Sequence, residues 1–163
     1  GTGRGLVSLA RAAGAAGVVY GLDISRGMVR EARRRLEEAG READTRLMLG
    51  DGAHLPLASG AFDAMFMSFT LELFDVGRLQ RVVDDCTRVL REGGRLCVVS
   101  MAKQDRGSLS VRIYEWVHEM MPRWVDCRPI PVEEVLERAG YEILGVEARS
   151  MWTIPVHVVL ARP

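Results

Sequence analysis

The sequence predicts an α/β protein with an open, mostly parallel sheet that ends in one antiparallel strand. Segments with helical periodicity alternate with short β-rich runs along most of the 163 residues. One of these runs, FDAMFMSF at residues 62–69, is apolar almost without alternation, which is typical of a strand covered on both faces. The last two runs follow each other with no helix between them, so they predict a closing hairpin.

The first helix is predicted over residues 4–13, where apolar side chains recur at the spacing of one helix face. These side chains are Leu6, Leu9, Ala10 and Ala13. Gly14 is the predicted stop of this helix. The glycines of the opening GTGRG therefore lead straight into a helix N-terminus.

A strand over residues 18–22 comes next and is closed by Asp23. Ser25 then suits the N-cap of a second helix, which Gly40 ends. The apolar face of that helix consists of Met28, Val29, Ala32 and Leu36. A short strand over residues 46–49 precedes the apolar strand.

The second half continues the alternation, with one interruption. A third helix has the apolar face Leu79, Val82, Val83, Cys86, Val89 and Leu90. Gly93–Gly94 is its predicted stop, and a strand over residues 95–100 follows. A helix over residues 132–139 begins after Pro131, which suits a first turn, and strands over 141–148 and 153–160 end the chain. Residues 101–131 fit the alternation poorly, and we expect one helix there, over 109–121.

Composition excludes several classes of function. Acidic and basic residues balance at 22 each, which argues against a main task on nucleic acids or acidic membranes. The basic run at residues 30–35 shares its helix with Glu31, Glu37 and Glu38, so we expect a solvated, salt-bridged face. There is no apolar run long enough to span a bilayer and no signal-peptide pattern.

The cysteines point to a reducing compartment. Cys86, Cys97 and Cys127 are odd in number and widely spaced, which predicts free thiols rather than disulfides or a metal site. We therefore expect a cytoplasmic protein with no bound metal.

Acidic residues and glycines gather where ligands bind in such sheets, beyond the carboxyl ends of the strands. Asp23 lies twenty residues after Gly3 and is placed to accept hydrogen bonds from ribose hydroxyls. Asp51 follows the next strand, where it could accept from an adenine amino group. Asp23 could also be an ordinary acid at a helix N-terminus, and Asp51 part of an ordinary Asp–Gly turn. A nicotinamide site would need G-x-G-x-x-G, but the sixth position is Leu6.

Five segments together resemble the class I S-adenosylmethionine-dependent methyltransferases, most closely the group of ubiquinone/menaquinone biosynthesis C-methyltransferases. In chain order they are GTGRG, YGLDIS with a Met two residues beyond, GDGAHLPLASGAFDAMFMSF, RVLREGGRL and VEEVLERAGYEI. The resemblance implies one Rossmann-like, doubly wound, three-layered domain over residues 1–163. It also implies S-adenosylmethionine as methyl donor, S-adenosylhomocysteine as product and a small organic acceptor.

The resemblance also implies roles for single residues. Gly1 and Gly3 would pack against the methionine part of the cofactor, and Asp23 would hold the ribose. Ser68 would lie close to the sulfonium. The residues at the adenine would be Ile24 and Met28 on its faces and Asp51, Gly52 and Ala53 at its edge.

Three features depart from the family pattern. The usual acid-x-G-x-G-T-G segment begins here at its last G-T-G, so we expect a further strand ahead of Gly1 in the natural protein. That strand would lie at the centre of the sheet, between the strands that end at Asp23 and Ser68. Glu92 replaces the usual Pro of a turn. The substrate-side insert at residues 101–131 differs from that of the quinone enzymes, which leaves the acceptor open.

The catalytic groups are expected on the acceptor side. Methyl transfer is an in-line displacement, in which a base helps only if the acceptor must lose a proton. The catalytic candidates are Glu72, Tyr114 and His118, with Asp75 and Asp126, Cys127 and Arg128 as further contacts. Two alternatives stay open: a non-catalytic scaffold or partner subunit, and an NAD(P)-dependent oxidoreductase. A homodimer is also possible.

Overall fold

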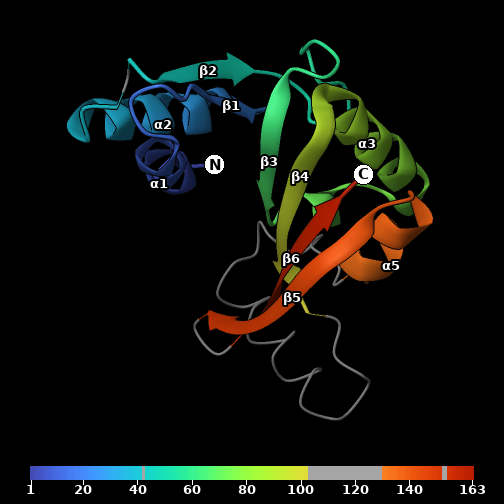
Figure 1. The fold of residues 1–163 in the computed structure, drawn as a ribbon. Helices are drawn as coiled ribbons and strands as arrows, with labels where there is room; N and C mark the ends of the chain where they lie inside the picture. Colours follow the sequence, from blue (N-terminus) through green and yellow to red (C-terminus); the bar gives the residue numbers. More distant parts are fainter. Residues whose placement is uncertain (42, 103–129, 152–153) are drawn as a thin grey trace. The chain divides into compact units, whose positions relative to one another are not determined.

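The computed structural model describes four stretches of the chain, namely residues 1–41, 43–102, 130–151 and 154–163 (Figure 1). Within them the chain forms two compact units, Gly1–Pro56 and Leu57–Pro163, called here the N-terminal and C-terminal units. The helix expected over residues 109–121 lies outside the described residues.

The N-terminal unit alternates helix and strand, as the sequence predicts. Its elements are α1 (Arg4–Ala13), β1 (Val19–Asp23), α2 (Arg26–Glu38) and β2 (Thr45–Leu49). β1 and β2 pair in parallel, with Asp23 opposite Leu49. Ser25 caps α2 by accepting from the Met28 N–H at 3.4 Å, which confirms the predicted N-cap. Gly14 and Gly40 follow the two helices with positive φ angles of 71° and 63°.

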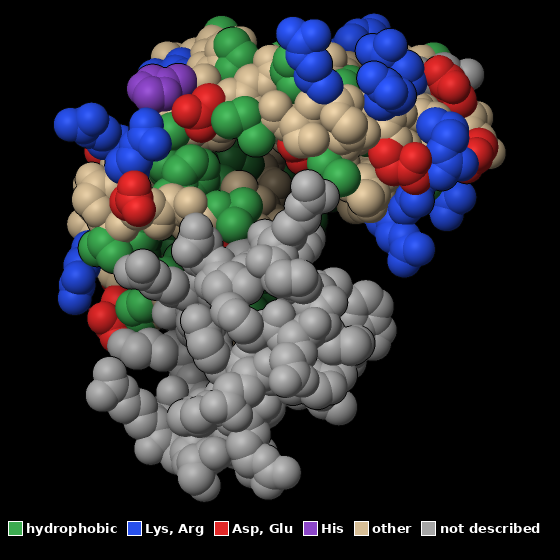
Figure 2. Space-filling model, turned by 180° about the vertical axis from the view of Figure 1, so that it is seen from behind, with side chains coloured by type: hydrophobic (Ala, Val, Ile, Leu, Met, Phe, Trp, Pro, Cys, Tyr) green, Lys and Arg blue, Asp and Glu red, His purple; other side chains and the backbone are tan. Residues whose placement is uncertain are grey.

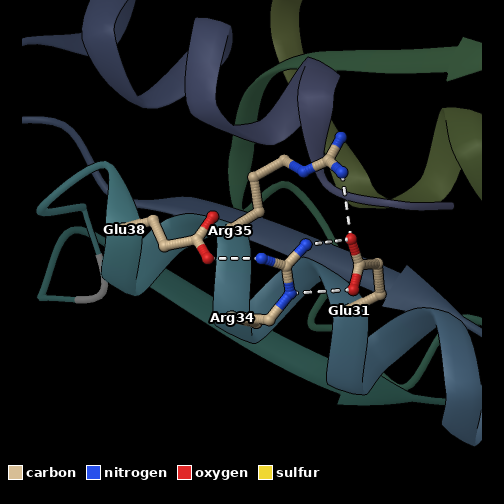
Figure 3. Close-up of polar contacts among 4 residues, drawn as sticks. All are labelled: Glu31, Arg34, Arg35 and Glu38. Atoms are coloured by element: carbon tan, nitrogen blue, oxygen red, sulfur yellow. Dashed lines mark hydrogen bonds and ion pairs between the residues drawn. The ribbon is translucent and has the colours of Figure 1, made fainter.

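Charges of both signs intermingle over the N-terminal unit (Figure 2). On α2, Arg34 pairs with Glu31 at 2.6 Å and also with Glu38, while Arg35 reaches Glu31 at 2.9 Å (Figure 3). The hydrogen bond from Arg34 lowers the pKa of Glu31. The predicted salt-bridged face is therefore confirmed, and solvent screens the pairs of the exposed Arg34 most.

The C-terminal unit holds a four-stranded mixed sheet. Its elements are β3 (Phe62–Ser68), the 3-10 helix η1 (Leu71–Leu73), α3 (Val76–Val89), β4 (Leu90–Met101), α5 (Val132–Arg138), β5 (Glu142–Met151) and β6 (Ile154–Arg162). The strand order is β3-β4-β6-β5, and β3 and β4 pair in parallel. β6 is antiparallel to both β4 and β5, which confirms the predicted closing hairpin.

The core of this unit lies between the sheet and the helices α3 and α5, which pack on the same face (Figure 1). The side chains there that are essentially inaccessible to solvent are Val82, Val83, Val89, Leu96, Val98, Leu136 and Val159. Burying each one contributes about 1.5–3 kcal/mol to folding. This hydrophobic layer holds β4 in place, and with it the turn after β3, where the Phe69 N–H donates to the Val99 carbonyl of β4.

The expectation that Gly93–Gly94 stops the third helix is wrong. The helix ends at Val89, and β4 begins at once with Leu90, whose ψ of 138° is already extended. Gly93 has a φ of 72°, and the pairing of β3 with β4 shifts register here. The glycines therefore form an irregularity inside a strand.

Within the C-terminal unit, the described helices cover one face of β3. Ala64, Phe66 and Ser68 are exposed on one face. On the other face Met67 Sδ lies 4.0 Å from Cys86 Sγ on α3. No helix described in the C-terminal unit packs on the face of β3 that carries Phe66, so the expectation that this strand is covered on both faces stays a prediction.

Candidate functional site

The glycine loop requires glycine at its third residue. Gly3 has a left-handed φ of 85° and caps α1, where its carbonyl accepts from the Val7 N–H at 3.0 Å. A Cβ at this position would lie 2.8 Å from Ala32 Cα on α2. A Cβ at Gly1, in contrast, would meet nothing within 4 Å beyond its chain neighbour. The loop therefore approaches α2 closely at Gly3 and is open at Gly1.

Replacing Gly3 by alanine is expected to lower the free energy of unfolding by about 1–3 kcal/mol, because it adds backbone strain and a clash with Ala32. Urea denaturation measures this loss. Gly1→Ala is the matched control in the same loop, with an expected change within about 0.5 kcal/mol. Equal stability of the two variants would show that Gly3 is not constrained in this way.

Asp23 joins the glycine loop to the start of α2. Its Oδ1 accepts from the Ser25 N–H at 2.8 Å, and its Oδ2 contacts the amino group of Gly1. The side chain is 22% exposed. Each carboxylate oxygen can accept a second hydrogen bond, so acceptor capacity is left for a ligand hydroxyl. The structure thus brings together the glycine loop and the acid that the sequence singled out.

Two large apolar side chains follow Asp23 and are exposed. Ile24, which precedes the N-cap of α2, is 73% exposed. Met28, in the first turn of α2, is 38% exposed. Exposed apolar side chains next to a partly exposed carboxylate are suited to a ligand with an apolar ring and a hydroxyl-bearing part.

Asp51 follows β2 in a turn. Its Oδ1 accepts from the Ala53 N–H at 2.9 Å, and its carbonyl accepts from the His54 N–H at 3.0 Å. Its Oδ2 lies 3.9 Å from Nδ1 of His54, whose side chain is exposed. The local turn accounts for the hydrogen bond of Oδ1, whereas the contact with His54 is the one found for Oδ2 among the described residues. Gly52 completes the turn, and Ala53 is buried.

In the C-terminal unit, a strained turn follows β3. Phe69 has a left-handed φ of 49°, which is uncommon for a residue other than glycine. Its N–H donates to the Val99 carbonyl at 2.8 Å, and Thr70 Oγ1 donates to the carbonyl of Ser68 at 3.0 Å. Such strain points to a site whose surroundings hold the chain in place. Nothing in the sequence signals it, since phenylalanine has no preference for this conformation.

The turn leads to a buried carboxyl group. Glu72 is 3% exposed, and its Oε1 accepts from the Ser100 hydroxyl at 3.3 Å. Its Oε2 has no hydrogen-bond partner among the described residues. Burial raises the pKa of Glu72, and hydrogen bonds from backbone groups and Ser100 oppose this only in part. Sequence reasoning identified Glu72 but missed Ser100, which is 28 positions away.

Glu72→Gln is expected to change the pH dependence of stability. A raised pKa in the folded state means that the stabilising contribution is full below the unfolded pKa, about 4.3. It is lost as the pH rises through the folded pKa of Glu72. Denaturation at several pH values should therefore show the wild type losing stability relative to Glu72→Gln as the pH rises. The exposed Glu137→Gln is the control, and a difference that does not vary with pH would refute the prediction.

The remaining candidates fall into two groups. Tyr114, His118, Asp126, Cys127 and Arg128 lie outside the described residues. Asp75 is described and precedes α3, where its side chain makes no cap hydrogen bond. Ser68 is exposed at the end of β3.

Two negative findings concern metals and membranes. The described residues contain no group of three or more His, Cys, Asp or Glu side chains that could hold a metal ion. Among the helices in the described stretches, none has both the length and the apolar character needed to cross a membrane.

Cys86 and Cys97 are free thiols, and burial raises the pKa of Cys86 to about 12.

Several curated proteins are similar in sequence, and two of them illustrate the range. A demethylmenaquinone methyltransferase of Symbiobacterium thermophilum is 25% identical over 87% of this chain and 65% of its own length. A phosphatidylethanolamine N-methyltransferase of Cereibacter sphaeroides is 33% identical over 56% of this chain and 44% of its own length. The chain thus spans less than two thirds of these relatives.

The fold and the family are shown by two further comparisons. The 4+2 cyclase SpnF has a similar fold, with a TM-score of 0.77 and 22% identity over 99% of this chain and 71% of its own. The model of a family described as methyltransferase domain matches residues 1–94. That match covers more than half of the chain and includes the glycine loop, Asp23, Asp51 and Glu72. On this ground the chain belongs to the methyltransferase domain family.

Proposed function

We propose that the full-length protein transfers a methyl group from S-adenosylmethionine to a small organic acceptor. The observation that carries this proposal is the partly exposed carboxylate of Asp23 at the end of β1, in the same unit as a glycine loop whose Gly3 has a left-handed φ and lies close to α2. Membership in the methyltransferase family supports it.

The residues of the N-terminal unit fit this cofactor. Gly1 leaves open space for the methionine part, and Gly3 holds the loop against α2. Asp23 accepts hydrogen bonds from the ribose hydroxyls with its free acceptor positions. The residues assigned to adenine are Ile24, Met28, Asp51, Gly52 and Ala53, of which Ile24 and Met28 offer exposed apolar surface. When bound, S-adenosylmethionine supplies a methyl group on a positively charged sulfur.

On the acceptor side we assign Glu72 as the catalytic residue and Ser68 to the neighbourhood of the sulfonium. Much of the rate comes from aligning the nucleophile with the methyl group and the sulfur. If the acceptor must lose a proton, Glu72 can take it, because burial gives its carboxylate a raised pKa and hence greater basicity. Ser100 fixes the carboxyl through Oε1 and leaves Oε2 for the proton.

The acceptor class is tested by a methyl-transfer screen. The full-length protein is incubated with S-adenosylmethionine carrying a labelled methyl group and with quinols, phenols, amines or carboxylic acids. The relatives named for menaquinone and phosphatidylethanolamine methylation make quinols and amines the first choices. We expect label to enter one class and S-adenosylhomocysteine to form in equal amount. S-adenosylmethionine binding without transfer in any class would favour the non-catalytic scaffold.

The protein is further proposed to act in the cytoplasm, on small molecules rather than nucleic acids, and as a homodimer. The two free thiols in the described residues support a reducing compartment. The intermingled charges on the N-terminal unit offer no continuous basic surface in the view of Figure 2.

A further inference from the structure

The strand β5 is the outer strand of the C-terminal sheet, and its outer edge has no partner among the described strands (Figure 1). Of its ten residues, all but Ile143 are exposed. An exposed edge of this length presents unpaired backbone groups to any strand that can match it. The question is which strand fits.

The regular part of β5 has a natural centre. The pairing with β6 is irregular between Ile143 and Gly145, and it then runs without a shift from Gly145 to Met151. Ala148 is the midpoint of this regular segment. If two copies align their segments antiparallel about a two-fold axis at Ala148, every residue from Gly145 to Met151 has a partner in the second copy. The small side chain of Ala148 meets its own copy at the axis.

The charges on β5 favour that same alignment. Glu147 and Arg149 are two positions apart and therefore lie on the same face of the strand. Arg149 Nη2 is 2.5 Å from Glu147 Oε2, and both side chains are about two thirds exposed. With the axis at Ala148, Glu147 of each copy lies opposite Arg149 of the other copy. Moving the axis to Glu147 or to Arg149 places like charges opposite each other, which is unfavourable.

We propose that β5 pairs with β5 of a second copy of this chain, antiparallel and centred on Ala148, and forms a homodimer with one continuous sheet. The regular segment carries one acid and one base in self-complementary positions, and a second copy adds an opposite charge across the axis to each of them. Val146, 44% exposed, and Met151, 37% exposed, lose water in the same contact. The proposal is independent of the reaction that the protein catalyses.

The test uses the full-length protein, charge reversal and sedimentation equilibrium. The wild type is expected to sediment as a dimer. Glu147→Arg and Arg149→Glu each place two pairs of like charges across the axis, so each should raise the dimer dissociation constant about tenfold or more. The double variant restores opposite charges and should return the constant to within about threefold of wild type.

The controls separate a specific contact from a general effect of charge. Glu137→Arg changes the net charge equally at an exposed position on α5 and should leave the dimer intact. Circular dichroism shows whether each variant is folded, and the double variant decides the case if a single variant is not. A monomeric wild type, single variants that dimerise as well as wild type, or a double variant no better than the single ones would each overturn the proposal.

Discussion

Replacing Asp23 by alanine is expected to weaken the binding of S-adenosylmethionine about 100-fold. The carboxylate has acceptor positions for two ribose hydroxyls, and two charge-assisted hydrogen bonds at about 1.5 kcal/mol each would be lost. Isothermal titration calorimetry of the full-length protein measures the loss. The melting temperature of the variant is measured as well, because Asp23 also accepts a hydrogen bond from the Ser25 N–H at the start of α2 and its loss can lower stability.

The matched control is Asp63→Ala. Asp63 also lies on a strand and carries an ion pair, with Arg91 Nε at 2.5 Å, but its side chain is 81% exposed and far from the glycine loop in sequence. We expect its cofactor affinity to equal that of wild type. If Asp23→Ala binds the cofactor as tightly as this control, Asp23 is only an acid at a helix N-terminus and the assigned site is wrong.

Glu72→Gln is expected to lower the rate of methyl transfer about 100-fold when the acceptor must lose a proton, with little change in cofactor affinity. The variant keeps the shape and the contact with Ser100 but cannot take a proton. In the wild type the rate should rise with pH through the raised pKa of Glu72, and the variant should lack this rise.

Ser100→Ala separates a chemical role from a structural one. The Ser100 hydroxyl lowers the pKa of Glu72 by donating to its carboxylate, so removing it should move the rise in rate to higher pH. Glu137→Gln is the control, since Glu137 is exposed on α5. If Glu72→Gln and Glu137→Gln transfer methyl groups at the wild-type rate, Glu72 has no part in the reaction.

The sequence predicts elements best where local signals agree. Apolar periodicity and Gly14 define α1 to the residue, and Ser25 defines the start of α2, because both signals act over a few neighbouring positions. The same reasoning fails at Gly93–Gly94. A glycine pair ends a helix in one context and allows an irregular strand in another, and the pairing of β4 with β3 decides which.

The residues of the candidate site also fall into those with a local sequence signal and those without one. The glycine loop and Asp23 can be predicted because one helix, α1, and one strand, β1, separate them along the chain. The contact of Glu72 with Ser100 joins two segments 28 positions apart, and the left-handed Phe69 that precedes it has no signal in the sequence. Burial of Glu72 is likewise a property of the packed unit, so its raised pKa appears only in the structure.

The central claim is that the glycine loop and Asp23 bind S-adenosylmethionine. It is tested most directly by calorimetric titration of the full-length protein with S-adenosylmethionine and with S-adenosylhomocysteine. We predict saturable binding of both, one molecule per chain, with a dissociation constant in the micromolar range that Asp23→Ala raises sharply. The absence of binding of either compound at high micromolar concentration would contradict the account.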